Sequence, residues 1–208
     1  TRFGLTHVKY GCIPWDGGID EPLSEEGWQI LAPSSLPYLP HSQPPIEMST
    51  DDMHSVRKQF ISAAINANDA GFDMIEVHLA HGYLLSSFIS PFTNQRQDDY
   101  GGNVENRMRF PLEVVSAVRA IWPADKPISV RISATDWVEG GLSEAEMLKV
   151  AAMLKQAHVD IINVSTGQVI KEEEPIYGRM FQVPFADQIR NEAGIPTTVA
   201  GNFTTADQ

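Results

Sequence analysis

Cysteine, basic side chains and long apolar runs are all scarce in this sequence. Cys12 is the single cysteine among 208 residues, which excludes a disulfide framework or a cysteine-rich zinc site and fits a reducing cytoplasm. The sequence has only 15 Lys and Arg against 27 Asp and Glu, so its net charge is −12. This charge argues against nucleic-acid binding, because phosphate contacts need clustered cations. No run approaches the roughly 18 apolar residues of a membrane span. We therefore expect a soluble, cytoplasmic protein with no nucleic-acid or membrane partner.

The composition still provides for a folded core, because 42% of the residues are hydrophobic. Residues 1–48 are rich in Pro and Gly and show no long period, which predicts a loop-rich lead-in segment. Residues 49–208 are periodic throughout and are predicted to form the folded unit.

Predicted helices and strands alternate from residue 49 onward. Helical spacing of apolar side chains covers residues 49–70, 104–121, 143–157 and 183–193. Between and after these helices, short β-type runs cover residues 73–79, 128–133, 160–165 and 196–200. Such an alternation predicts βα units and a parallel sheet.

Two α/β architectures fit this pattern. A doubly wound dinucleotide-binding sheet should carry a G-x-G-x-x-G turn, which the sequence lacks. Strand alternation places polar residues on one face of three neighbouring strands: Glu76, His78, Ser129, Arg131, Ser133, Asn163 and Ser165. A polar strand face lines the C-terminal mouth of a barrel. The sequence therefore predicts a (βα)8 TIM barrel, present as a fragment with about four of its eight strands.

Reactive side chains are densest around His78, His81 and Tyr83, where the first long strand ends. Two imidazoles three residues apart can converge on one oxygen atom or one metal ion, and the phenol could deliver a proton. In isolation such a pair is more often structural, with His78 in the core and Tyr83 packing. A position at the end of a barrel strand favours the catalytic interpretation.

Charged residues outside this cluster have mostly structural interpretations. An arginine inside a barrel needs an anionic or planar partner, so we expect Arg131 to meet Glu76 in a buried ion pair, an electron-rich ligand, or both. In the polar loop that follows residue 90, the charges can pair with one another and with loop carbonyls: Arg96, Asp98, Glu105 and Arg107. The run Glu172-Glu173-Glu174 is interpreted as a solvated loop rather than a metal site.

Several motifs in order resemble the Old Yellow Enzyme family of flavin-dependent ene-reductases. They are His78-Leu-Ala-His81-Gly-Tyr83, Ser90-Pro91, Asn94-Gln-Arg96, Tyr100-Gly-Gly102, Glu105-Asn-Arg107, Arg131-Ile-Ser133 and Asn163-Val-Ser165. The resemblance covers roughly residues 49–205. Two further stretches look like the reductase half of aminobenzoyl- and salicylyl-CoA monooxygenase fusions: Asp136-Trp-Val-Glu-Gly-Gly141 and Tyr177-Gly-Arg-Met-Phe-Gln182.

This resemblance implies FMN at the mouth of the barrel, NADH or NADPH as reductant, and hydride transfer from flavin N5 to an α,β-unsaturated carbonyl compound. The fragment would hold about strands four to seven. His78 and His81 would bind the carbonyl oxygen, as donors aimed at developing charge, and Tyr83 would protonate the α-carbon. The flavin contacts would be Arg131, which Glu76 would orient, and Gly201 and Asn202 on the seventh strand.

The finer resemblance suggests a small-molecule substrate derived from an aromatic CoA thioester, such as a CoA-linked cyclic enone. It leaves open a homo-oligomer or a fusion to an upstream monooxygenase domain. If Leu5-Thr-His7 is the family's flavin-binding site, Gly4 occupies the position of its Gln and Val8-Lys9-Tyr10 breaks the motif. We expect instead that the chain begins just past that site and lacks the eighth strand with its phosphate-binding arginine.

Two other hypotheses stay open. A metal-dependent barrel hydrolase or lyase would use His78 and His81 as ligands, with Asp136 as the best available third ligand. Alternatively, the fragment is inactive and binds nothing.

Overall fold

The computed structural model describes residues 29–40 and 42–205, so the predicted departure at Gly4 and His7 lies outside the described residues. Its centre is a four-stranded parallel sheet in the order β3-β4-β5-β6. The strands are β3 (Ile75–Leu79), β4 (Ile128–Ser133), β5 (Ile161–Ser165) and β6 (Thr197–Val199). Because the strands run in sequence order with a helix between neighbours, the sheet has the βα topology of a barrel wall.

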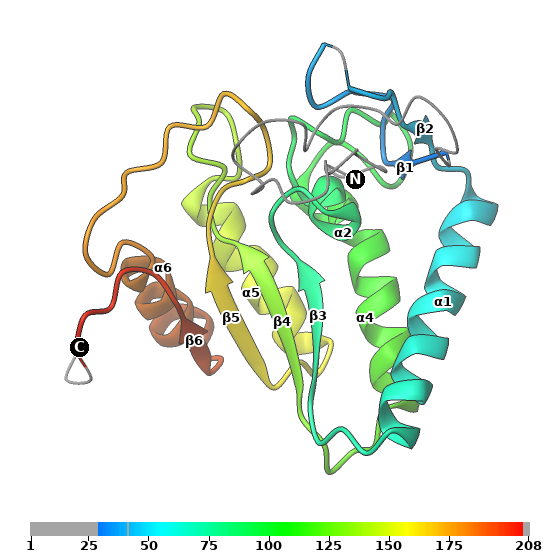
Figure 1. Cartoon of the computed structure of the whole chain (residues 1–208), viewed down its shortest axis with the longest axis vertical. Helices are drawn as coiled ribbons and strands as arrows, with labels where there is room; N and C mark the ends of the chain where they lie inside the picture. Colours follow the sequence, from blue (N-terminus) through cyan, green and yellow to red (C-terminus); the bar gives the residue numbers. More distant parts are fainter. Residues whose placement is uncertain (1–28, 41, 206–208) are drawn as a thin grey trace, which may run out of the picture.

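Helices cover one face of this sheet (Figure 1). The covering elements are α4 (Arg109–Ile121), α5 (Glu144–Gln156) and α6 (Val183–Gln188), which a π-helical turn extends over Ile189–Ala193, while α1 (Thr50–Asp69) packs beside α4. The strands bury their apolar side chains against them: Val77, Leu79, Ile128, Val130, Ile132, Ile162 and Val164. The hydrophobic core therefore lies between sheet and helices, and the polar strand face points the other way.

Capping residues fix where two of the helices begin. Ser49 accepts a hydrogen bond from the N–H of Asp52, whose carboxylate accepts from the Ser49 N–H in return. Ser143 and Glu146 form the same reciprocal capping box at α5.

The structure differs from the sequence prediction at two helices. The predicted helix 104–121 is divided into α3 (Val104–Arg107) and α4, with the break at Met108. Pro111 has no N–H to donate to the Arg107 carbonyl, which interrupts the helical hydrogen-bond pattern there. A further helix, α2 (Leu84–Ile89), was not predicted, because six mostly buried residues are too few to show a helical period.

The segment before α1 is fastened to the loop that follows α2. It contains the two-residue strands β1 (Leu31–Ala32) and β2 (Ile46–Glu47), which pair in parallel. Arg96 donates to the carbonyl oxygens of Pro33 at 3.0 Å and Met48 at 2.8 Å. The chain then passes so close to Arg96 that a Cβ on Gly101 would lie 2.1 Å from the Arg96 carbonyl oxygen.

The loop charges are structural, as predicted, although their partners are partly different. Arg96 pairs with Asp98 as expected, and Glu105 pairs with Lys149. Arg107 pairs with Glu146 of α5 and also donates to the carbonyls of Ile89 and Gly102, both at 2.6 Å. Its side chain is only 4% exposed, so one buried cation joins α2, α3 and α5.

Replacing Arg107 by Met is therefore expected to lower the free energy of unfolding by about 3–5 kcal/mol, because Glu146 and two carbonyls lose their partner in a buried site. Urea unfolding at pH 7 measures this loss. Lys149→Met is the matched control, since it breaks an ion pair whose side chains are 58% and 51% exposed and should have little effect on stability. Equal losses for the two variants would contradict a structural role for the buried cation.

Among the described residues, none of the helices combines the length and the apolar character that crossing a lipid bilayer demands.

Candidate active site

The parallel register brings the polar residues of three strands together on the uncovered face. Glu76 lies opposite Ser129, and His78 lies opposite Arg131. The Glu76 carboxylate accepts hydrogen bonds from the Ser129 hydroxyl at 2.8 Å and from the Asn163 amide at 3.0 Å. The predicted polar face is therefore present, and some of its polar side chains are hydrogen-bonded to one another.

The loop after β3 folds over the ends of β4 and β5. His81 has a positive φ of 62°, its N–H donates to the Ser133 hydroxyl at 3.0 Å, and its Nε2 lies 2.7 Å from the Ser165 hydroxyl. At Gly82, also at positive φ, a Cβ would lie 2.8 Å from the Gln168 carbonyl oxygen. The His81 backbone is thus bound by β4 and its imidazole by β5, at the mouth of the site.

His78, His81 and Tyr83 form one cluster. The ring centroid of His78 lies 5.3 Å from that of His81 and 5.0 Å from that of Tyr83. The Tyr83 side chain remains open to solvent, with the residue 37% exposed. The structure therefore brings together the three residues that the sequence predicts to be catalytic.

The pKa of His78 is lowered from its ordinary value, first by burial and then by the charge of Arg131, against an opposing effect of Glu76. A lowered imidazole pKa means that His78 is neutral at pH 7. One ring nitrogen then carries a proton that can be donated to a ligand oxygen.

Arg131 corrects one expectation. In the part of the chain that the structure describes, it forms no ion pair with Glu76, whose carboxylate is bound by Ser129 and Asn163. The register explains this, because Arg131 lies two residues further toward the mouth than the residue opposite Glu76. Its Nη2 donates to the Ser165 hydroxyl at 3.4 Å, and its Nε is buried without a hydrogen-bond partner.

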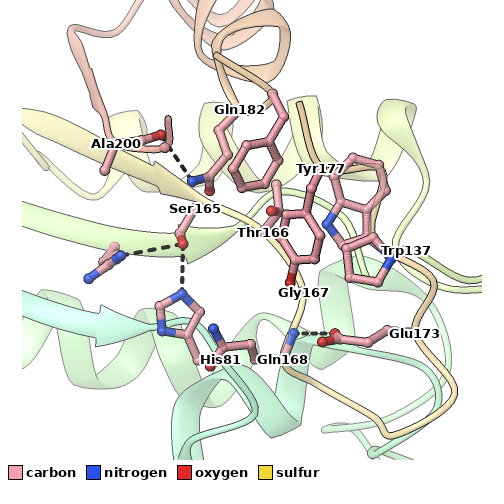
Figure 2. A pocket seen from close by; sticks show the side chains of 14 residues that line it. His81, Trp137, Ser165, Thr166, Gly167, Gln168, Glu173, Tyr177, Gln182 and Ala200 are labelled. Atoms are coloured by element: carbon pink, nitrogen blue, oxygen red, sulfur yellow. Dashed lines mark hydrogen bonds between the residues drawn. The ribbon is translucent and has the colours of Figure 1, made fainter. Parts of the chain in front are cut away.

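A cavity of about 230 Å³ opens beside His81 (Figure 2), and neither His78 nor Tyr83 is among its lining residues. One side is formed by His81, Arg131 and Ser165 at the strand ends. Aromatic side chains from the loops after β4 and β5 form another part of the wall: Trp137, Tyr177 and Phe181. The wall therefore combines hydrogen-bonding groups with flat apolar surfaces, as small-molecule sites do.

The two residues predicted on the last strand behave differently. Gly201 lines the cavity, with a positive φ of 116°. Asn202 does not line it, and its side-chain amide donates to the Gly178 carbonyl at 3.1 Å. Sequence reasoning missed Trp137 and Gln182 as lining residues, although both lie within stretches that carry the family resemblance.

Asp136 is not placed to be a metal ligand beside the histidines. Its carboxylate accepts hydrogen bonds from the Ser90 hydroxyl at 2.7 Å and the Leu142 N–H at 3.0 Å, and burial raises its pKa. Across residues 29–40 and 42–205, no three His, Cys, Asp or Glu side chains are grouped so that they could hold a metal ion. The described structure therefore gives the metal-dependent alternative no support.

Comparison with known proteins finds relatives that agree with one another in family. The family model of the NADH:flavin oxidoreductase / NADH oxidase family matches residues 21–208. An NADPH dehydrogenase of Bacillus pumilus is 45% identical over 179 residues, which cover 86% of this chain and 52% of that protein. The chain thus spans about half the length of the curated relatives it matches.

Solved structures agree in fold. The complex of 2-naphthoyl-CoA reductase with 2-naphthoyl-CoA has a TM-score of 0.78 and 26% identity, covering 88% of this chain and 28% of that one. The Old Yellow Enzyme homologue of Zymomonas mobilis has a TM-score of 0.67 and 25% identity, covering 85% of this chain and 52% of that one. The predicted barrel fragment and the predicted family resemblance are both confirmed. The chain belongs to the NADH:flavin oxidoreductase / NADH oxidase family.

Proposed function

We propose that this chain forms part of an NAD(P)H-dependent flavin oxidoreductase that reduces an alkene conjugated to a carbonyl group. The observation that carries the proposal is the cluster of His78, His81 and Tyr83 beside a cavity that Arg131 also lines. Its relatives include NADPH dehydrogenases, whose name states the reductant.

The residues present fit FMN as the cofactor. Arg131 has a buried Nε with no partner in the described residues, and a planar ring system with carbonyl and nitrogen acceptors would supply one. Gly201 lines the same cavity. When bound, FMN would accept hydride from a nicotinamide and pass it to the alkene.

The cluster of His78, His81 and Tyr83 would bind and protonate the substrate. Neutral His78 can donate one N–H to the carbonyl oxygen, which stabilises negative charge that develops there. The contact between His81 Nε2 and the Ser165 hydroxyl can be exchanged for the substrate oxygen, since either oxygen can accept a hydrogen bond from an imidazole N–H. Tyr83 would donate a proton to the α-carbon.

A CoA-linked cyclic enone is the substrate class that we favour. The aromatic wall of Trp137, Tyr177 and Phe181 suits a flat ring, and one structural relative is a reductase solved with 2-naphthoyl-CoA. We also propose a cytoplasmic site of action, which the single cysteine supports. The complete reading frame would test the expected monooxygenase fusion, and the native mass would test a homo-oligomer.

The full-length protein should purify yellow with one non-covalent FMN per chain. Anaerobic NADPH or NADH should bleach the flavin absorbance, and a cyclic enone should restore it. Heat-released flavin, quantified by chromatography, gives the stoichiometry. A colourless protein with stoichiometric zinc would overturn the proposal in favour of a metal-dependent enzyme.

A further inference from the structure

Unpartnered polar atoms are concentrated around the cavity. In the described part of the chain, four buried side-chain atoms lack a hydrogen-bond partner. Three of them belong to residues that line this cavity: Arg131 (Nε), Trp137 (Nε1) and Gln182 (Oε1). Because a buried polar atom without a partner is destabilising, this concentration indicates a polar ligand.

Gln182 is the lining residue whose orientation is best fixed. It is 6% exposed, and its Nε2 donates to the Ala200 carbonyl at 3.0 Å, which identifies the other amide atom as the unpartnered oxygen. Figure 2 shows the amide nitrogen toward Ala200 and the amide oxygen on the side of Ser165. A Cβ on Gly201 would lie 2.7 Å from Gln182 Nε2, so the amide packs closely against Gly201 in space that a larger residue would fill.

The mixture of unpartnered groups identifies the kind of ligand. Arg131 and Trp137 offer donors, whereas Gln182 offers an acceptor. A ketone oxygen or an ionised phosphate can only accept hydrogen bonds, but each hydroxyl of a polyol both donates and accepts. Two of the proposed flavin contacts, Arg131 and Gly201, line the same cavity.

We propose that Gln182 is a cofactor-binding residue whose Oε1 accepts a hydrogen bond from a hydroxyl of the flavin's ribityl chain. This inference rests on the proposed flavin function. It adds a residue that lies in the loop before α6, at the backbone N-cap of that helix.

Flavin binding to the apoprotein of Gln182→Leu tests the inference without any turnover. Leu keeps the approximate volume and removes the acceptor. The Kd values of FMN and riboflavin, from quenching of flavin fluorescence, should rise about tenfold, because one hydroxyl loses its acceptor in a buried site. The Kd of lumiflavin, which has the ring system but no ribityl chain, should be unchanged.

Gln188→Leu is the matched control, because it makes the same exchange in α6 at an exposed side chain that contacts Glu144. It should leave all three Kd values unaltered. An equal rise for riboflavin and lumiflavin with Gln182→Leu would overturn the inference, because the effect would then lie on the ring system or on the shape of the site and not on the ribityl chain. Unaltered FMN binding with a raised KM for the enone would also overturn it, by assigning Gln182 to the substrate.

A second measurement needs no variant and so does not depend on the folding of Gln182→Leu. Riboflavin analogues that each lack one ribityl hydroxyl are bound to the wild-type apoprotein. One analogue should bind about tenfold more weakly than riboflavin. If all of them bind as riboflavin does, Gln182 is not a ribityl contact. If the wild type binds no flavin, the proposed function itself fails.

Discussion

Replacing Tyr83 by Phe is expected to slow alkene reduction by about 10²–10⁴-fold, the usual contribution of a general acid. The phenol lies beside His78, with ring centroids 5.0 Å apart, and is 37% exposed at the mouth of the site. Reduction of flavin by the nicotinamide transfers hydride but needs no proton from this phenol, so its rate should be unchanged. Stopped-flow absorbance measures the two half-reactions separately.

Tyr100→Phe is the control for loss of a tyrosine hydroxyl. Its hydroxyl donates to Glu113 of α4 at 3.1 Å, so it is engaged outside the cluster of His78, His81 and Tyr83. Both half-reactions of this control should proceed at wild-type rates. Equal effects of Tyr83→Phe on the two rates would remove Tyr83 from the mechanism and indicate a packing role.

Replacing His78 and His81 together by Ala should weaken the binding of phenols, whose oxygen mimics the polarised carbonyl, by about 10²–10⁴-fold. Each imidazole would contribute a hydrogen bond to a charged oxygen, worth about 1.5–3 kcal/mol. Titration of the long-wavelength absorbance of the phenol–flavin complex gives the Kd. The flavin should be retained, because neither imidazole is proposed to hold it.

His54→Ala serves as the comparison, since His54 is exposed on α1 and contacts Arg57. Its phenol Kd should equal that of the wild type. Undiminished phenol binding by the double variant would show that the two imidazoles serve another purpose. Loss of the flavin would instead mean that the cluster supports the cofactor.

Much of the sheet could be predicted because the alternation of apolar and polar residues is local information. The predicted strand 128–133 coincides with β4, and the other predicted strands begin or end within two residues of β3, β5 and β6. The helix break at Met108 was missed because the apolar spacing continues across it. The break comes from a backbone hydrogen bond that Pro111 cannot donate, and apolar spacing does not report on it.

The candidate site was predictable to the extent that its residues share a motif or a strand. His78, His81 and Tyr83 lie within six consecutive residues, and strand alternation alone places Arg131 on their face. The expected Glu76–Arg131 ion pair was wrong because alternation determines the face of a residue but not its register against the next strand. Gln182 reaches the cavity only through the packing of α6 against β6, which no local pattern encodes.

The close approach of Gly101 to Arg96 has an evolutionary consequence. A side chain at position 101 would collide with the backbone of Arg96, so no other residue fits there without a change in the shape of this loop. The stretch around Gly178, in the loop after β5, has more room, since nothing lies within 4 Å of a Cβ at Gly178, and Ile176 and Tyr177 are 75% and 69% exposed. Residues 176–178 can therefore change within a lineage with little effect on the fold, whereas position 101 is constrained to glycine.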